Sequence, residues 1–266
     1  MKEQILSKLA PGHPWSELLQ YHDTLDSTNT LAKSLALQGA PHGTVIIAGQ
    51  QTGGRGRMGR SFHSPAGSGL YLSAIIRPDC AAGELMHLTC AVAVAVCDAV
   101  EAATGLQPGI KWINDLVCGQ RKVAGILTEL VLEPSTGKAA AAIIGIGINC
   151  QQSPADFPPE LRDIAGSLSM AASQKISPAA VAAAVMDQLY TMSSRLLQDR
   201  AIIMERYRSR CITISKDVSL HRANTVTHGR AIGVDDDGAL LVAHADGTVE
   251  TVNSGEASVR GMYGYV

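Results

Sequence analysis

Three features that would place a protein in a common class are missing from this sequence: a long apolar run, a cysteine pair at CxxC spacing and an HExxH motif. The most apolar stretch, residues 90–100, is far shorter than the roughly 20 residues that a membrane-spanning helix needs. The N-terminal "MKEQILSKLAPGHPW" contains no long apolar run either. We therefore expect a cytoplasmic protein that does not bind a membrane.

The six cysteines, at positions 80, 90, 97, 118, 150 and 211, show neither disulfide nor metal-finger spacing. In a chain without a secretory signal we expect them to be reduced thiols. Cys90 and Cys97 are seven positions apart in a predicted helix, so they share a face and should pack in the core. The eight histidines are scattered and predict no dedicated zinc site.

An excess of positive charge is missing as well. The formal net charge is -2 and the isoelectric point is about 6.4, so no overall field would hold nucleic acid non-specifically. Any contact with phosphate must therefore come from a local group of cations. The 266 residues, 46% of them hydrophobic, suffice for one large core or for a main domain with a small appendage.

Four helical segments are predicted by their caps and apolar spacing. The expected ranges are residues 26–39, 84–104, 178–197 and a further piece to about 209. Asp26 or Ser27 should cap the first helix and Gly39 should end it. The second is rich in alanine and valine and long enough to be buried. The third opens on Ser177 and Pro178.

Apolar strands are predicted between these helices. The expected ranges are residues 44–50, 69–78, 110–118, 121–133 and 138–150. Turn residues separate the last three, which predicts a mostly antiparallel meander. Beyond Cys211 the sequence becomes a string of short alternating segments, and roughly 55 residues with five short strands predict a small barrel. We therefore expect a main domain over residues 1–210 and a barrel over residues 211–266.

The loop "GGRGRMGRSFHSPAGSG" at 53–69 joins the first two strands and contains Arg55, Arg57 and Arg60 among six glycines. Glycines let the backbone approach an anion, and arginines supply fork-shaped donors for phosphate or carboxylate. One alternative is an arginine-rich RNA-binding segment, although such segments lie in disordered chain and this loop is held between two apolar strands. Another alternative is a solvated hairpin tip.

Two nucleotide-binding patterns overlap this loop. Residues 54–59 match the GxGxxG fingerprint, and residues 54–61 fit a phosphate-binding loop with Arg60 in place of its lysine. Both motifs need a helix directly after the last glycine. Here "SFHSPAGSGLYL" follows, with Pro65 and two glycines, so we expect neither motif in its usual form.

Together with three further stretches, the loop resembles the signature of biotin protein ligases, enzymes that join biotin to a lysine of carboxylase carrier domains. The matching stretches are "DSTN" at 26–29, "GRGRMGR" at 54–60, "KWINDL" and "RKVAGILTE" within 111–129, and "GIGIN" at 145–149. They come in the family's order and spacing. The resemblance implies an α+β fold: a mixed, largely antiparallel sheet backed by helices, similar to class II synthetases, followed by a small SH3-like barrel.

The resemblance also implies a reaction in two steps that uses ATP and Mg²⁺. The carboxylate of biotin attacks the α-phosphate of ATP to give biotinyl-5'-adenylate and pyrophosphate. A lysine of a biotin carboxyl carrier domain, from acetyl-CoA carboxylase or pyruvate carboxylase, then attacks this mixed anhydride. Fixed cations must offset the repulsion between the carboxylate and the triphosphate. A homodimer is compatible with the resemblance.

Positions that match the family's motifs imply the site residues. Biotin-binding residues would be Ser27, Thr28, Asn29, Gln51, Gly54, Arg55, Arg57, Lys122 and Gly125. ATP-binding residues would be Arg57, Arg60, Phe62, Asn114, Lys122, Asn149 and Arg260, and the metal ligand would be Asp115. By the resemblance, Arg57 and Lys122 are catalytic: Arg57 holds the adenylate and prevents its escape, and Lys122 contacts the carboxylate and phosphoryl oxygens. Arg55 and Arg60 would guide pyrophosphate or order the loop.

The sequence departs from the family pattern at three positions. Ile113 stands where proline is more common, and Phe62 and His63 stand where the family usually has tryptophan followed by an aromatic residue. Two of the matching residues could also be present for local structural reasons. Ser27 is a helix cap in its own right, and Arg260 suits the surface of a strand.

Three other functions compete with a stand-alone biotin protein ligase. A lipoate or octanoate transferase shares the sheet but not this set of motifs. A biotin-sensing repressor carries an N-terminal DNA-binding domain, for which the segment before "DSTN" is too short, so we expect no DNA partner. A non-catalytic RNA-binding protein would bind RNA in a salt-sensitive way and release no pyrophosphate.

Overall fold

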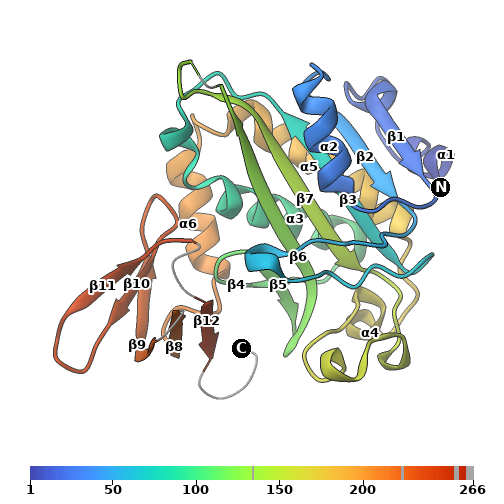
Figure 1. Cartoon of the computed structure of the whole chain (residues 1–266). Helices are drawn as coiled ribbons and strands as arrows, with labels where there is room; N and C mark the ends of the chain where they lie inside the picture. The colour runs from blue at the N-terminus through green and yellow to red at the C-terminus, as the bar shows by residue number, and fades with distance from the viewer. Residues whose placement is uncertain (134, 223–224, 255–257, 262–266) are drawn as a thin grey trace.

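The computed structural model describes residues 1–133, 135–222 and 225–254, and the backbone of residues 258–261 (Figure 1). Its strands form two sheets. The larger has seven strands in the order β1-β2-β3-β7-β6-β5-β4, and the C-terminal sheet has five in the order β11-β10-β9-β8-β12. The predicted combination of a large sheet and a small C-terminal β-domain is confirmed.

The larger sheet is mixed but mostly antiparallel, as predicted, because β1 and β2 are parallel and its other neighbouring strands are antiparallel. Its strands are β1 (Leu19–His22), β2 (Thr44–Ala48), β3 (Gly69–Ile76), β4 (Gly109–Lys111), β5 (Asp115–Cys118), β6 (Arg121–Leu132) and β7 (Ala139–Asn149). The helices are α1 (Lys2–Leu6), α2 (Thr28–Leu37), α3 (Leu88–Thr104), α4 (Leu168–Ala172), α5 (Pro178–Arg195) and α6 (Arg200–Arg210). The elements α1, β1 and α4 were not predicted from the sequence.

Alternation along the strands gives this sheet two apolar faces. Ile46, Ile75 and Ile143 pack with α2 in a small buried cluster on one face. Their neighbours Val45 and Ile144 belong to the main core on the other face, which α3 and α5 cover (Figure 1). The sheet is therefore buried on both sides.

The predicted caps of the first helix are confirmed. Ser27 is the N-cap of α2, and its hydroxyl accepts a hydrogen bond from the Thr30 amide at 3.5 Å. Gly39 follows the helix with a φ of 89°, a left-handed conformation that glycine adopts without strain. The cap places Ser27 and Thr28 at the edge of the cavity described below.

The predicted helix at 84–104 begins later than expected, at Leu88, because residues 82–85 form a tight 3-10 turn. In this turn the Glu84 carboxylate accepts a hydrogen bond from the Ala81 amide at 2.9 Å. Cys90 and Cys97 are fully buried on α3, as predicted. By length and composition the segment Ala82–Thr104 could cross a membrane, but 72% of its most apolar window is buried inside the fold, as in a core helix.

The prediction of one continuous strand over residues 110–118 was wrong. The chain turns back after β4, and Lys111 pairs with Asp115 at the start of β5, so the stretch forms a hairpin. The peptide bond between Trp112 and Ile113 in its turn is cis. Both apolar side chains are buried in this turn, where Trp112 Nε1 donates to the Gly238 carbonyl of the C-terminal domain at 2.9 Å.

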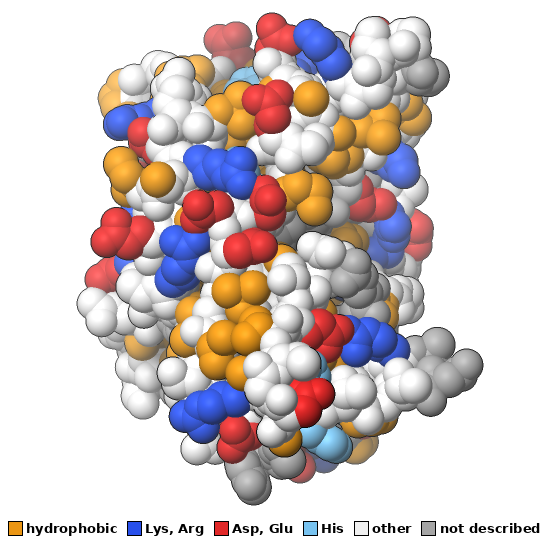
Figure 2. All heavy atoms as spheres, turned by 90° about the vertical axis from the view of Figure 1, so that its left-hand side faces the viewer, with side chains coloured by type: hydrophobic (Ala, Val, Ile, Leu, Met, Phe, Trp, Pro, Cys, Tyr) orange, Lys and Arg blue, Asp and Glu red, His pale blue; other side chains and the backbone are white. Residues whose placement is uncertain are grey.

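The C-terminal sheet is antiparallel and has its own buried residues. Its strands are β8 (Asp217–Arg222), β9 (Thr225–Val234), β10 (Leu240–Ala243), β11 (Val249–Val252) and β12 (Ser258–Gly261). Ion pairs from Arg200 to Asp237 and from Arg208 to Asp236 join it to α6. Figure 2 shows basic and acidic side chains intermixed on this side of the molecule. The predicted boundary between residues 210 and 211 follows α6 directly and stays a prediction.

Candidate active site

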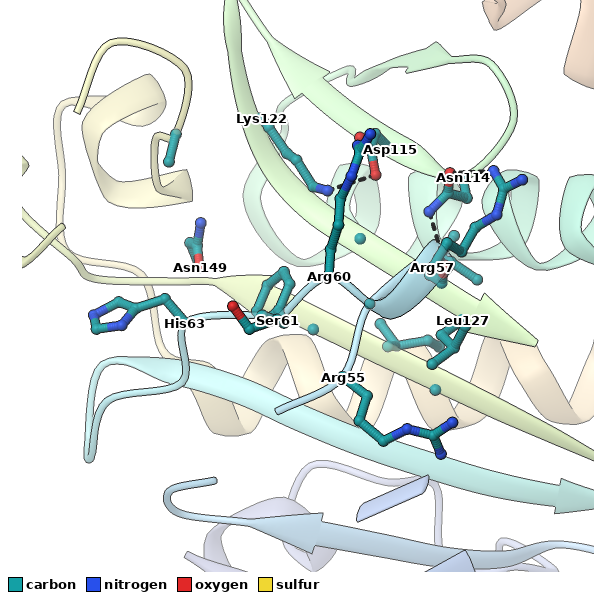
Figure 3. A pocket seen from close by; sticks show the side chains of 18 of the residues that line it. Arg55, Arg57, Arg60, Ser61, His63, Asn114, Asp115, Lys122, Leu127 and Asn149 are labelled. Atoms are coloured by element: carbon teal, nitrogen blue, oxygen red, sulfur yellow. Dashed lines mark hydrogen bonds and ion pairs between the residues drawn. The ribbon is translucent and has the colours of Figure 1, made fainter. Parts of the chain in front are cut away.

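A cavity of about 720 Å³ opens between the larger sheet and residues 53–64, called the flap below (Figure 3). This volume suits a small-molecule site. The lining comes from the start of α2, the flap, the turn between β4 and β5, the strands β6 and β7, and the segment 157–165. Its charged and amide side chains are Asn29, Gln51, Arg55, Arg57, Arg60, Lys111, Asn114, Asp115, Lys122 and Asn149.

The flap folds back on itself as a short hairpin, in which the Phe62 amide donates to the Gly54 carbonyl at 2.9 Å. At its tip, Met58 and Gly59 have φ values of 54° and 72°. Glycine adopts this left-handed conformation freely, whereas a methionine in it is strained. No helix follows between residues 61 and 68, so the flap is neither a dinucleotide fingerprint nor a phosphate-binding loop of the usual kind, as predicted.

A chain of hydrogen bonds connects the sheet to the flap. The fully buried Ser73 hydroxyl on β3 lies 2.7 Å from Thr28 Oγ1. The amide and hydroxyl of Thr28 donate to Gln51 Oε1 at 2.9 and 3.1 Å. Gln51 Nε2 then donates to Ser64 Oγ at 3.0 Å, and Ser64 donates to the Phe62 carbonyl at 2.9 Å. These bonds fix the orientation of the Gln51 amide at the edge of the cavity.

Asn29 crosses from α2 to the strands β6 and β7. Its Nδ2 donates to the Leu127 carbonyl at 3.3 Å and to Glu129 Oε2 at 3.0 Å, while its Oδ1 lies 2.6 Å from Ser73 Oγ. The amide fills the space above Gly145, where a Cβ would lie only 2.1 Å from Asn29 Oδ1. Asn29 therefore braces the floor of the cavity.

Arg55 ties the flap to β6. Its two terminal nitrogens lie 3.1 Å from the two carboxylate oxygens of Glu129, the paired geometry that arginine makes with carboxylates. In Figure 3 its guanidinium points away from Lys122 and Asp115. Of the two roles expected for Arg55, the geometry favours ordering the flap over contact with pyrophosphate.

Arg57 connects the flap to the β4–β5 turn and to the C-terminal domain. Its Nη1 donates to Asn114 Oδ1 and its Nη2 donates to Ser254 Oγ, both at 2.9 Å. Asn114 Nδ2 donates to the Ile126 carbonyl at 2.9 Å, which turns Oδ1 toward Arg57. Burial lowers the pKa of the Arg57 guanidinium, and the nearby Asp115 carboxylate opposes this effect. Arginine remains charged in such a setting.

Lys122 and Asp115 form an ion pair at the same end of the cavity. Lys122 Nζ lies 2.6 Å from Asp115 Oδ1, and both side chains are mostly buried. The two residues lie on neighbouring strands, with a β-bulge at residues 116–117 between them. Among the described residues no group of three histidine, cysteine, aspartate or glutamate side chains could hold a metal ion.

The Phe62 ring covers two paired glycines of the sheet, Gly125 on β6 and Gly147 on β7. A Cβ at Gly147 would lie 2.5 Å from the Phe62 ring, and one at Gly125 would lie 3.4 Å from it and 3.2 Å from Lys122 Nζ. Both glycines thus make room for the flap and Lys122. Gly125 was expected to contact biotin, and in this structure Phe62 and Lys122 occupy the space beside it.

Comparisons with known proteins identify the family of this chain. Residues 21–149 match the biotin/lipoate A/B protein ligase family, and residues 214–260 match the biotin protein ligase C-terminal domain. The bifunctional ligase/repressor BirA of Bacillus subtilis is 41% identical over 233 residues, which cover 86% of this chain and 70% of the relative. The chain belongs to the biotin protein ligase family.

Two other members of the biotin protein ligase family match along nearly their whole length. The biotin--[acetyl-CoA-carboxylase] ligase of Mycobacterium tuberculosis is 30% identical over 257 residues, covering 93% of this chain and 91% of the relative. The structure of the biotin protein ligase from Aquifex aeolicus in complex with biotin and ATP has a TM-score of 0.76 at 27% identity. The superposition covers 91% of this chain and 98% of that one.

Among the described side chains, the residues expected from the resemblance to biotin protein ligases all line this cavity, apart from Gly54. Gly54 lies at the base of the flap, where a Cβ would come within 2.4 Å of the Phe62 carbonyl oxygen. Arg260 lies on β12 opposite Ser219, and its side chain lies outside the described part of the chain. Asn149 lines the cavity, but its amide already donates to the Gly166 carbonyl at 2.9 Å.

The structure adds residues that the sequence analysis of this biotin protein ligase missed. Glu129 anchors Arg55, Ser64 supports Gln51, and Ser254 contacts Arg57 from the C-terminal domain. Glu129 is the last residue of the matching stretch "RKVAGILTE", so the resemblance could have identified it as a site residue. Ser254 carried no signal, because it lies outside every stretch that matches the family and 197 residues from Arg57.

Proposed function

We propose that this chain activates biotin with ATP and transfers it to a carrier protein. In the first step a carboxylate oxygen of biotin attacks the α-phosphorus of ATP and pyrophosphate leaves, which gives biotinyl-5'-adenylate. In the second step the amine of an acceptor lysine attacks the biotinyl carbonyl, AMP leaves and the amine loses a proton. The observation that carries the proposal is the convergence of Arg57, Asn114, Asp115 and Lys122 on one end of the cavity.

These residues suit the electrostatics of the first step. Two anions must meet, and fixed cations in a partly buried site stabilise the charge that develops as they react. Lys122 and Arg57 are such cations, each held by a neighbour from the β4–β5 hairpin. Lys122 would contact the biotin carboxylate and the phosphoryl oxygens, and Arg57 would hold the adenylate. Arg60 extends into the same region (Figure 3) and would meet the triphosphate.

The other end of the cavity suits the uncharged part of biotin. Ser27, Thr28 and Gln51 supply hydroxyl and amide groups, which the ureido group of biotin would bond, beside the apolar surface of β6 and β7. Phe62 would then shift from its glycines or pack on the ligand. A closed flap would also shield the anhydride from water.

Mg²⁺ would be held by Asp115 together with the triphosphate, and Asn114 would assist in placing the phosphates. A single protein carboxylate is enough for this ion, because Mg²⁺ in nucleotide sites is usually bound by one or two carboxylates and the substrate phosphates. When bound it neutralises charge on the triphosphate. Arg260 and Asn149 remain candidates for nucleotide contacts.

The acceptor would be a biotin carboxyl carrier domain of acetyl-CoA carboxylase or pyruvate carboxylase, and the enzyme would work in the cytoplasm, where ATP is available. The name of the Mycobacterium tuberculosis relative supports the first of these acceptors. The match of residues 214–260 to a biotin ligase C-terminal domain favours biotin over lipoate.

The test is biotin-dependent exchange of labelled pyrophosphate into ATP, with lipoate offered in parallel. We expect exchange with biotin, and labelling of a purified carrier domain when one is added. Exchange with lipoate and none with biotin would show that the chain is a lipoate ligase instead. No exchange with either compound would refute the adenylation step.

A further inference from the structure

The C-terminal domain reaches the flap through one side chain. Ser254, two residues after β11 (Val249–Val252), places its hydroxyl 2.9 Å from Arg57 Nη2. We propose that Ser254 is a positioning residue, which latches the flap over the cavity by accepting this hydrogen bond. The effect of Ser254 on flap opening does not depend on which reaction the protein catalyses. Its effect on the release of biotinyl-adenylate rests on the proposed function.

The Arg57 guanidinium is held on both sides, and only one of its two partners belongs to its own domain. Asn114 accepts from Nη1 and cannot swing away, because its amide nitrogen is bonded to the Ile126 carbonyl. Without Ser254 the guanidinium would keep a single bond and could rotate about it. Two bonds to two terminal nitrogens fix the plane of the group as well as its position.

The same domain also supports the other partner of Arg57. Trp112, two residues before Asn114, donates from Nε1 to the Gly238 carbonyl at 2.9 Å, and its backbone amide donates to Thr213 Oγ1 at 2.9 Å. The hairpin turn that carries Asn114 is therefore bonded to the C-terminal segment at two points. The bond between Arg57 and Ser254 joins elements whose relative positions are already fixed, so little conformational entropy is lost when it forms.

A surface serine near a long arginine is often an incidental contact. Arg57, however, is half-buried and Ser254 accepts from a charged donor, which makes the bond stronger than one between neutral groups. Because Ser254 itself is exposed, we expect a moderate effect, a change in flap opening of between about 3- and 10-fold when the hydroxyl is removed.

Hydrogen–deuterium exchange of the unliganded protein measures flap opening without any activity. In Ser254→Ala, the amides of residues 54–62 should exchange faster by the expected factor, while Ser254→Thr, which keeps the hydroxyl, should exchange at the wild-type rate. Thr251→Ala serves as the matched control, since it removes an exposed hydroxyl from the adjoining strand β11. Equal flap exchange in Ser254→Ala, Thr251→Ala and the wild type would overturn the latch.

A double-mutant cycle ties the effect to Arg57. In an Arg57→Ala background, Ser254→Ala should change flap exchange no further, whereas an undiminished change would mean that Ser254 acts through another group. With biotin and ATP, Ser254→Ala should release biotinyl-adenylate faster by a similar factor. If the wild type forms no adenylate, the proposed function fails and the exchange experiment still decides the latch.

Discussion

Lys122 Nζ on β6 lies 2.6 Å from Asp115 Oδ1 on β5, and each side chain is more than two-thirds buried. The principal cation of the proposed adenylation site is thus neutralised by a carboxylate until a substrate arrives. A biotin carboxylate and a triphosphate would offer Lys122 other anions, while Asp115 would be left to face Mg²⁺. We therefore expect Lys122 and Asp115 to exchange each other for the substrate anions and Mg²⁺ together, when the substrates bind.

Lys122→Ala should reduce the rate of biotin-dependent pyrophosphate exchange by about 100- to 1,000-fold, the usual effect of removing one electrostatic donor from an active site. The loss should lie mainly in kcat, because the charge that Lys122 stabilises grows during the reaction. Lys138→Ala is the matched control, since that lysine is exposed and pairs with Asp79 at 3.4 Å. Normal exchange by Lys122→Ala would remove Lys122 from the mechanism.

Glu129→Gln should loosen the flap while changing overall stability little. The Arg55–Glu129 pair has good geometry, but Arg55 is 45% exposed and screened by solvent, so we expect a loss in the free energy of unfolding below about 1 kcal/mol. Exchange of the flap amides should nevertheless rise, as Arg55 loses its charged partner. Asp199→Asn, which breaks the surface pair with Arg195, should leave flap exchange unchanged, and an equal rise in both variants would contradict a specific anchor.

Much of this fold could be predicted because its signals are local. Ser27 and Ser177 are helix caps whose hydroxyls bond an amide three residues later, and such caps are visible in a short window of sequence. The runs of β-branched and apolar residues in β2, β3, β6 and β7 likewise predict strands from the local sequence. The start of α3 was misplaced because a 3-10 turn and an α-helix have similar apolar spacing.

The remaining features depend on contacts between distant residues. The hairpin at 110–118 resembles one apolar strand in the sequence, and the bond from Trp112 in its turn to the distant Gly238 carbonyl has no local sequence signal. The sequence also suggested that Arg55 or Arg60 guides pyrophosphate, but the composition of a loop does not tell which way each arginine points. The bond from Arg57 to Ser254 spans 197 residues and has no counterpart in any local pattern.

Gly147→Ala should impair the site through the flap rather than through the sheet. A Cβ there would overlap the Phe62 ring at 2.5 Å, so the ring and the flap must move, at a cost of about 1 to 3 kcal/mol for an overpacked position. We expect weaker biotin binding, measured by calorimetry, and partial recovery in the Gly147→Ala/Phe62→Ala double variant. Gly83→Ala is the control, because a Cβ there meets no atom within 4 Å. If the double variant binds biotin no better than Gly147→Ala, the clash does not involve Phe62.

Acid should destabilise the fold through buried histidines, chiefly His87 at the start of α3. Its side chain is fully buried, and burial lowers its pKa from the ordinary 6.5, although the bond from Nε2 to the Leu196 carbonyl opposes the change. The folded chain therefore takes up a proton less readily than the unfolded one, so stability is complete above pH 6.5 and falls as the pH drops toward the folded-state pKa. The loss is about 1.4 kcal/mol for every pH unit between the two pKa values.

Urea unfolding at about pH 7.5 and about pH 5.5 measures this loss, since the difference between the two free energies of unfolding reports the extra protons bound by the unfolded state. His87→Gln keeps a donor for the Leu196 carbonyl and removes the titrating ring, so the variant should lose less stability between the two pH values than the wild type. His228→Gln, at an exposed position on β9, should keep the wild-type difference. An identical pH dependence in His87→Gln and the wild type would assign the acid sensitivity to His13 and His42, whose pKa values burial also lowers.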